Sequence, residues 1–83
     1  MSEQMAIIRK PGFGMRDMNE PGLWFDIYTS DNSAALQVFH GDAALDVIRA
    51  YGVYDVKDLE GKPCLVEAAH GMMRYVRAMK AGA

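Results

Sequence analysis

Alternation of side-chain character marks one segment of the chain as a strand. In residues 23–30, LWFDIYTS, one side of an extended chain carries Leu23, Phe25 and Ile27. The other side carries Trp24, Asp26 and Tyr28. A period of two, with aromatic and β-branched residues, is typical of a half-buried strand. We therefore expect the first set to face the core and the second to lie on the opposite face of the sheet.

Turn residues around this segment extend the pattern into a meander. A turn at Pro11, Gly12 and Gly14 precedes residues 13–18, which are able to extend as a strand. NEPG at 19–22 is typical of a type II turn, and SDNS at 30–33 predicts the next turn. AALQVFH at 34–40 then reads as a third strand. Residues 12–40 are thus predicted to form a three-stranded antiparallel meander.

The hydrophobic period changes from two to that of a helix after residue 40. In GDAALDVIRAYG the residues at helical spacing are Ala44, Leu45, Ile48 and Tyr51. Asp42 near the start and Arg49 near the end suit the helix dipole. Gly52 is placed to end the helix in a left-handed cap.

The remaining residues predict a short helical turn and a closing hairpin. Asp55 is placed to cap a single turn over 56–59, and Pro63 cannot continue it. Residues 64–68 and 72–80 alternate as two strands around a short loop. The predicted fold class is α+β: an antiparallel sheet of about five strands, with the helix packed on one face of the sheet.

Length and composition indicate one domain, residues 1–83, with 1–10 and 80–83 loosely ordered. The chain has 83 residues, is 51% hydrophobic and has a net charge of −2, which is typical of a globular protein. Its one cysteine cannot form an internal disulfide, and no apolar run approaches the roughly 18 residues that cross a bilayer. We therefore expect a cytoplasmic protein with no membrane, metal or cofactor partner.

The charges are unevenly placed along the chain. Residues 17–48 contain six acidic residues and no Lys or Arg: Asp17, Glu20, Asp26, Asp31, Asp42 and Asp46. Phosphate binding depends on Lys and Arg, so this block disfavours direct nucleic-acid binding and favours a basic partner surface. The alternative is that these acids only solvate the outer face.

Candidate chemistry is sparse. Cys64 needs a base to act as a nucleophile, and His70 lies about 20 Å away along a strand at about 3.3 Å per residue. His40 with Asp42 offers only two metal ligands. We therefore predict a buried strand cysteine and no enzyme, and retain a cysteine enzyme only as a third hypothesis.

Two further features allow more than one interpretation. Gly12 and Gly14 lack the strand, GxGxxG and helix context of a phosphate loop, which favours a role in turning or close packing. The methionines fill core gaps or form an adaptable binding surface: Met15, Met18, Met72, Met73 and Met79.

The segments GFGMRD, LWFDIYTSDNSAALQVF and GVYDVKDLEGKPCLVE resemble small uncharacterised accessory proteins of bacteriophages and prophages, many of which have an L-x-G-K-P-C turn. The likeness spans about residues 11–79 and assigns no catalytic residue. EAAHGMM, in the last hairpin loop, has an unusual apolar run. Such proteins include stoichiometric inhibitors of host defence such as anti-CRISPR proteins, and the resemblance implies that role here.

The leading hypothesis is a non-catalytic inhibitor that docks an acidic and aromatic face onto a basic nucleic-acid-binding surface of a host protein or ribonucleoprotein complex. Its predicted partner-binding residues are Trp24, Asp26, Tyr28, Asp31, Asp17 and Glu20. The alternative is a small-ligand or nucleotide-binding protein with a pocket between the mates of a homodimer. In that case the GFG turn and Arg16 would lie near the ligand.

Overall fold

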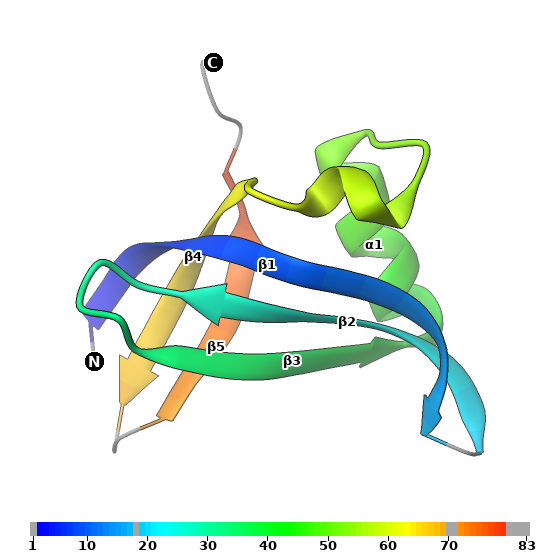
Figure 1. The fold of residues 1–83 in the computed structure, drawn as a ribbon, viewed down its shortest axis with the longest axis horizontal. Coiled ribbons are helices and arrows are strands. Elements are labelled where there is room, and N and C mark those ends of the chain that lie inside the picture. The colour runs from blue at the N-terminus through cyan, green and yellow to red at the C-terminus, as the bar shows by residue number, and fades with distance from the viewer. Residues whose placement is uncertain (1, 18, 70–71, 80–83) are drawn as a thin grey trace.

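The computed structural model describes residues 2–17, 19–69 and 72–79, with the side chains of residues 2 and 17 outside that description. It has five strands and one α-helix (Figure 1). The elements in chain order are β1 (Ser2–Asp17), β2 (Glu20–Tyr28), β3 (Ala34–His40), α1 (Gly41–Tyr51), the 3-10 helix η1 (Val56–Leu59), β4 (Pro63–Ala69) and β5 (Met72–Ala78). The predicted α+β class, with a meander, one helix and a closing hairpin, is confirmed.

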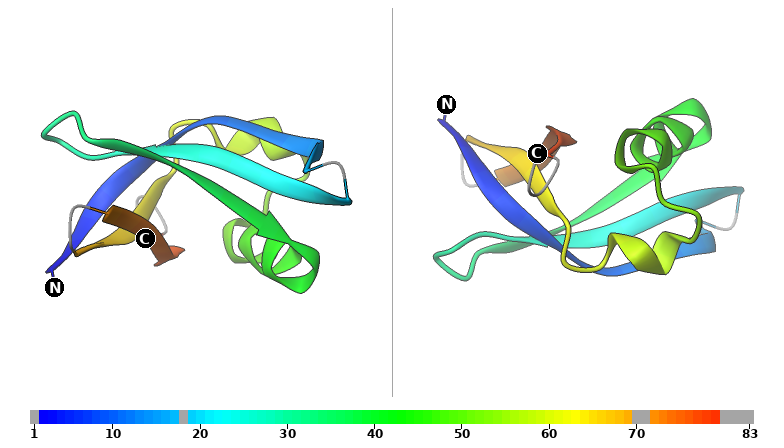
Figure 2. Two further views of the ribbon diagram at one scale, coloured as in Figure 1. Left: turned by 90° about the horizontal axis from the view of Figure 1, so that it is seen from below. Right: turned by 90° about the horizontal axis from the view of Figure 1, so that it is seen from above.

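The strands form one antiparallel sheet in the order β3-β2-β1-β4-β5. The long strand β1 belongs to both halves, because its residues 2–7 pair with β4 and its residues 7–17 pair with β2. This shared strand is bent, and the sheet curls strongly around the core (Figure 2). Residues 2–10, expected to be loosely ordered, form the first part of β1, because β4 pairs with residues 2–7 and β2 pairs with residues 7–9.

The curl brings the two edge strands, β3 and β5, close together. The Gln37 side chain of β3 spans the gap: its Oε1 accepts a hydrogen bond from the Tyr75 backbone N–H at 3.0 Å. Its Nε2 donates to the Met73 carbonyl oxygen at 3.4 Å. One side-chain amide thus makes the contacts that a backbone ladder would make between these edges, and the sheet becomes a partly closed barrel.

The core fills the inside of this barrel. Leu23, Phe25 and Ile27 are completely buried, as their alternation predicts. Around them lie buried side chains from four other elements: Ala6, Ile8, Ala44, Val47, Leu59, Cys64 and Val66. The ring of Phe25 also packs against Phe39 and Tyr75, with centroids 5.3 and 5.8 Å away.

Helix α1 lies at one end of the curled sheet, on its inner side (Figure 2). It ends as predicted at Gly52, whose φ of 65° is left-handed. Its buried residues are Ala44 and Val47, whereas Leu45, predicted to face the core, is 44% exposed. Ile48 and Tyr51, also expected on the apolar stripe, are half-buried and pack against the core, so the stripe is as predicted except that Val47 is buried in place of Leu45. At η1 the Asp55 side chain accepts a hydrogen bond from the Lys57 N–H at 3.0 Å, which confirms the predicted cap.

The first hairpin turn lies earlier than expected. Asp17 pairs with Glu20, so β2 has already begun where the type II turn was predicted, at residues 19–22. Gly22 is buried in β2, and a Cβ added there would lie 2.8 Å from the His40 ring. This glycine therefore serves close packing between two strands rather than the turn.

A β-bulge interrupts β1 at Lys10. Arg9 pairs with Asp26 and Gly12 pairs with Trp24, so β1 has one residue more than β2 between these pairs. Lys10 has a φ of 53°, an unusual value for a residue other than glycine. The Glu60 carboxylate holds the bulge, because Oε1 accepts from the Lys10 N–H at 2.8 Å and Oε2 from Arg9 at 3.0 Å.

Candidate ligand-binding face

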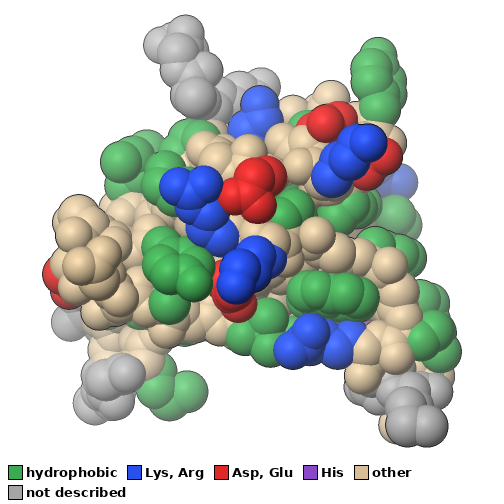
Figure 3. All heavy atoms as spheres, viewed as in Figure 1, with side chains coloured by type: hydrophobic (Ala, Val, Ile, Leu, Met, Phe, Trp, Pro, Cys, Tyr) green, Lys and Arg blue, Asp and Glu red, His purple; other side chains and the backbone are tan. Residues whose placement is uncertain are grey.

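The outward side of strands β1, β2 and β3 brings aromatic, aliphatic and charged side chains together on one surface of the described chain. We call it the outer face. Strand register places on it Ile7, Arg9, Gly12, Trp24, Asp26, Tyr28, Leu36 and Val38. Figure 3 shows Lys and Arg side chains over the middle of this face, with acidic side chains directly beside them and hydrophobic groups around them.

Trp24 lies flat against the backbone of β1. A Cβ added to Gly12 would lie 2.5 Å from Cε2 of the indole, and one added to Gly14 would lie 3.6 Å from the ring. Only a glycine at position 12 lets the ring lie there. The bulge at Lys10 matters because it shifts the alternation of β1 by one residue and so brings Gly12 opposite Trp24.

The indole ring has a cationic neighbour. The guanidinium carbon of Arg16 lies 5.5 Å from the ring centroid, which is within cation–π range. Arg16 itself is exposed. One side of the indole thus rests on Gly12, and a guanidinium lies over the ring.

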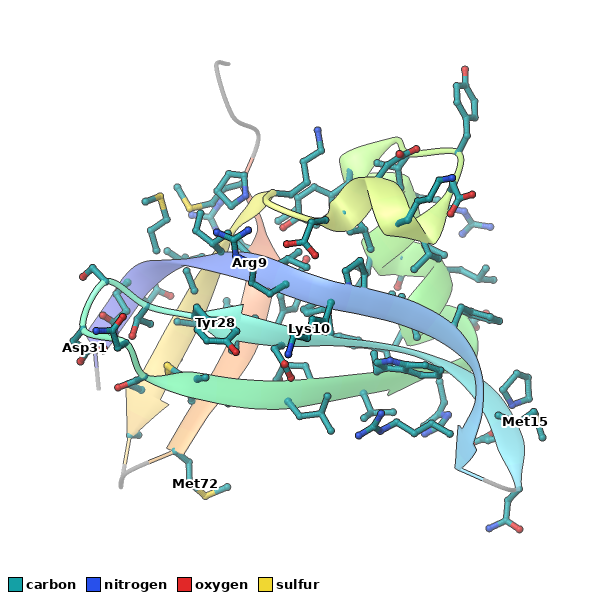
Figure 4. All side chains as sticks on the ribbon, in the orientation of Figure 1. Arg9, Lys10, Met15, Tyr28, Asp31 and Met72 are labelled. Carbon is teal, nitrogen blue, oxygen red and sulfur yellow. The ribbon has the colours of Figure 1, made fainter. Side chains whose placement is uncertain are left out.

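Two further cations lie on the same face, at the bulge. Figure 4 shows Arg9 and Lys10 on the viewer's side of β1, with Tyr28 of β2 nearby. Arg9 is ion-paired with Glu60 at 3.0 Å, and both side chains remain about half exposed at 53% and 45%. The hydrogen bonds from the Lys10 N–H and Arg9 keep the pKa of Glu60 below its usual value. Glu60 thus stays anionic and holds Arg9 at the surface.

The third strand adds an apolar border to the face. Leu36 and Val38 of β3 are 44% and 40% exposed, and they lie in register with Asp26 and Trp24 of β2. The outer face therefore combines aromatic rings and exposed aliphatic groups with charges of both signs: the cations Arg9, Lys10 and Arg16, the central carboxylate of Asp26, and Glu60 paired with Arg9.

The six predicted partner-binding residues separate into groups. Trp24, Asp26 and Tyr28 share the outer face, as their alternation predicts. Asp31 lies in the β2–β3 turn, where its carboxylate accepts hydrogen bonds from the Thr29 hydroxyl and from the Ser33 N–H. These bonds lower the pKa of Asp31, that from Thr29 first, so this residue has a local structural role.

The remaining two acids lie at the far end of the β1–β2 hairpin. Glu20 lies 3.6 Å from Nδ1 of His40, measured from its Oε1. Asp17 ends β1, and its side chain is outside the described part of the chain. The acidic block is therefore spread over a hairpin end, a turn, a strand and a helix. Asp26 lies between Trp24 and Tyr28 on the outer face, and Glu20 has the same parity on β2 but lies at the hairpin end beside His40.

Cys64 has no features of a nucleophile. It is completely buried in β4, and burial raises the pKa of its thiol to about 11. His40 lies on another strand with its Nδ1 3.3 Å from the Pro21 carbonyl oxygen, and His70 lies outside the described residues. Within residues 2–17, 19–69 and 72–79, no group of three His, Cys, Asp or Glu side chains is placed to hold a metal ion.

Arg9 and Lys10 were missed by the sequence analysis, which placed them in a loosely ordered start. The available signal was the run IIRKPGFG, in which two cations directly precede the glycines that lie beneath Trp24.

The chain matches no protein-family model, no curated protein and no solved structure. Among the described helices, none is long and apolar enough to span a membrane. The case for function therefore rests on the outer face.

Proposed function

We propose that this chain is a non-catalytic binding module for single-stranded nucleic acid, and that the outer face is its binding surface. The observation that carries the proposal is the Trp24 ring, laid on Gly12 with the Arg16 guanidinium over it, where a base would stack in place of the guanidinium. Sequence-tolerant binding of single strands combines aromatic rings, on which bases stack, with cations that follow the phosphates. Lys10 and Arg16 supply such cations around Trp24 and Tyr28, and Arg9 is a third cation, paired with Glu60.

The strand arrangement supports the same proposal by analogy. A bent first strand shared by two halves, in a five-stranded and partly closed barrel, resembles the OB-fold. In that fold the face of strands 2 and 3 binds oligonucleotides. Here that face holds Trp24, Tyr28, Leu36 and Val38. Topology alone does not determine function, so the side chains carry the argument.

The single tryptophan of the chain provides a direct test. A mixed-sequence strand of about 12 nucleotides, within the usual site size for such folds, is titrated into the protein while Trp24 fluorescence is recorded. Stacking of a base on the indole is expected to quench the fluorescence. With phosphate contacts from Lys10 and Arg16, and Arg9 paired with Glu60, log affinity should fall with log salt at a slope of about −1.4, from about −0.7 per contact.

Charge variants give the controls. Arg16→Ala and Lys10→Ala should each weaken binding and reduce the salt slope by about 0.7. Arg49→Ala removes another exposed cation from α1, away from the outer face, and should leave the slope unchanged. Absence of both quenching and binding at about 50 mM salt, where screening is weak, would refute the proposal.

A second candidate uses the same face for a protein. Exposed Leu36 and Val38 beside an aromatic ring also suit a protein interface, and Asp26 would select a basic partner. Under this candidate the chain is the inhibitor of a host defence complex, anti-CRISPR-like and phage-encoded, that its resemblance implies. Asp26→Lys should change affinity in opposite directions under the two candidates. It should tighten the binding of an oligonucleotide but abolish binding to a basic protein surface.

A further inference from the structure

Asp26 is the feature of the outer face that non-specific phosphate binding does not explain. It is half-buried between Trp24 and Tyr28 on β2, with Arg9 of β1 in register beside it. A carboxylate at the centre of a cationic face repels phosphates. Its presence there costs affinity for the backbone of any strand that crosses the face.

The carboxylate is open to a ligand. Arg9, the cation in register with it, is instead bound to Glu60 at 3.0 Å. Within the described part of the chain, no hydrogen bond or ion pair engages the Asp26 side chain. An ionised carboxylate has only acceptor sites, so a ligand group that meets it there has to be a donor.

Asp26 lies midway between the two rings along β2. Trp24 and Tyr28 are four residues apart on one strand, about 13 Å at about 3.3 Å per residue. Bases in a continuous stack are about 3.4 Å apart, so bases on the two rings are not stacking neighbours. A nucleic acid that stacks one base on each ring therefore has at least one nucleotide between these two bases, and that nucleotide passes over Asp26.

The bases differ in what they offer to a carboxylate. Guanine presents two adjacent donors, N1–H and the N2 amino group, which fit the two carboxylate oxygens together. Cytosine and adenine each present one amino group, and an acidic side chain is a known partner of the cytosine N4 amino group. Thymine and uracil present one N–H between two carbonyl oxygens, which the carboxylate repels.

We propose that Asp26 is a specificity-determining residue that selects guanine, and disfavours thymine and uracil, at the position between the two stacked bases. The inference rests on the proposed function. It adds a base preference to a surface whose other contacts are independent of sequence. A good bidentate contact to a base corresponds to about 5- to 150-fold discrimination, which is the effect expected here.

The test compares two oligonucleotides that differ at one base. Oligothymidine of about nine nucleotides, and the same strand with one central guanine, are titrated by fluorescence anisotropy. The wild-type chain should bind the guanine strand at least about fivefold more tightly. Asp26→Asn, in which an amide that both donates and accepts replaces the carboxylate, should lose most of this preference.

Asp46→Asn provides the matched control, because it makes the same chemical change on α1, where the side chain is 75% exposed. It should keep the guanine preference in full. Equal affinity of the wild-type chain for both strands would overturn this inference and leave the proposed function standing. A uniform rise in affinity for both strands in Asp26→Asn, with the guanine preference intact, would overturn it too. Binding of neither strand would refute the proposed function itself.

Discussion

Gln37→Leu removes the side-chain amide that joins the two edges of the sheet. The wild-type amide accepts from the Tyr75 N–H at 3.0 Å and donates to the Met73 carbonyl oxygen at 3.4 Å. The leucine side chain has a similar size but neither a hydrogen-bond acceptor nor a donor. The variant therefore leaves a half-buried N–H and a carbonyl without these partners while the packing volume changes little.

The expected loss is worked from the two bonds between the edges; the third bond of this side chain, from Nε2 to the Leu36 carbonyl oxygen at 3.0 Å, lies within β3. A net contribution of about 1 kcal/mol for each gives about 2 kcal/mol, within the range of about 1 to 3 kcal/mol for leaving a buried polar group unpaired. For a domain of this size, 1 kcal/mol corresponds to about 4 to 8 °C in Tm, so Tm should fall by about 8 to 16 °C. Thermal unfolding followed by circular dichroism measures the change.

Amide hydrogen exchange tests the cause. In Gln37→Leu the Tyr75 N–H should exchange much faster, whereas amides between β1 and β2 keep their protection. Gln37→Glu keeps the acceptor Oε1 and loses the donor, so it should retain protection at Tyr75 and have an intermediate Tm. A Tm within about 2 °C of wild type in Gln37→Leu, with Tyr75 still protected, would refute the view that this amide closes the barrel.

Three further predictions concern the outer face, the thiol and the bulge. Gly12→Ala should displace the Trp24 ring and shift its fluorescence maximum, since the added Cβ would lie 2.5 Å from the indole. Gly14→Ala should leave the maximum unchanged, because its Cβ would lie 3.6 Å from the ring. Equal shifts in the two variants would contradict the described packing of Trp24. Cys64 should resist alkylation at neutral pH until the chain unfolds. Burial raises the pKa of this thiol to about 11 in the folded chain, so folding favours the neutral thiol, and the free energy of unfolding should fall as pH rises from about 9 to 11. The fall should be smaller in Cys64→Ala. Urea titrations at both ends of this pH range measure the free energy of unfolding. Lys10→Gly should raise the free energy of unfolding by up to about 1 kcal/mol, because glycine adopts a φ of 53° without strain. A lower free energy of unfolding would contradict this and show that the lysine side chain itself supports the bulge.

Local pattern predicted much of the fold. The alternation in residues 23–30 identified both the buried and the outward side of β2, and the change of period identified α1 with its cap at Gly52. Asp55 was identified as the cap of η1 from its residue type and place alone. These features depend on neighbours within one turn or one strand, which a sequence displays directly.

The candidate site was predicted only in part. Trp24, Asp26 and Tyr28 were placed together correctly because they lie on one strand. The charge around them was not, because Arg9, Lys10 and Arg16 reach the face through pairing between different strands. The run of acidic residues in the sequence therefore predicted an acidic face, whereas the folded surface around Trp24 also carries three cations.

By itself, the sequence determined the elements and the two sides of its clearest strand, since each follows from local periodicity and capping. The tertiary structure alone decided three things: the bend that shares β1 between two halves of the sheet, the bulge that brings Gly12 beneath Trp24, and the closure through Gln37. All three depend on register between segments far apart in the chain, and a shift of one residue in register would turn each side chain to the other face.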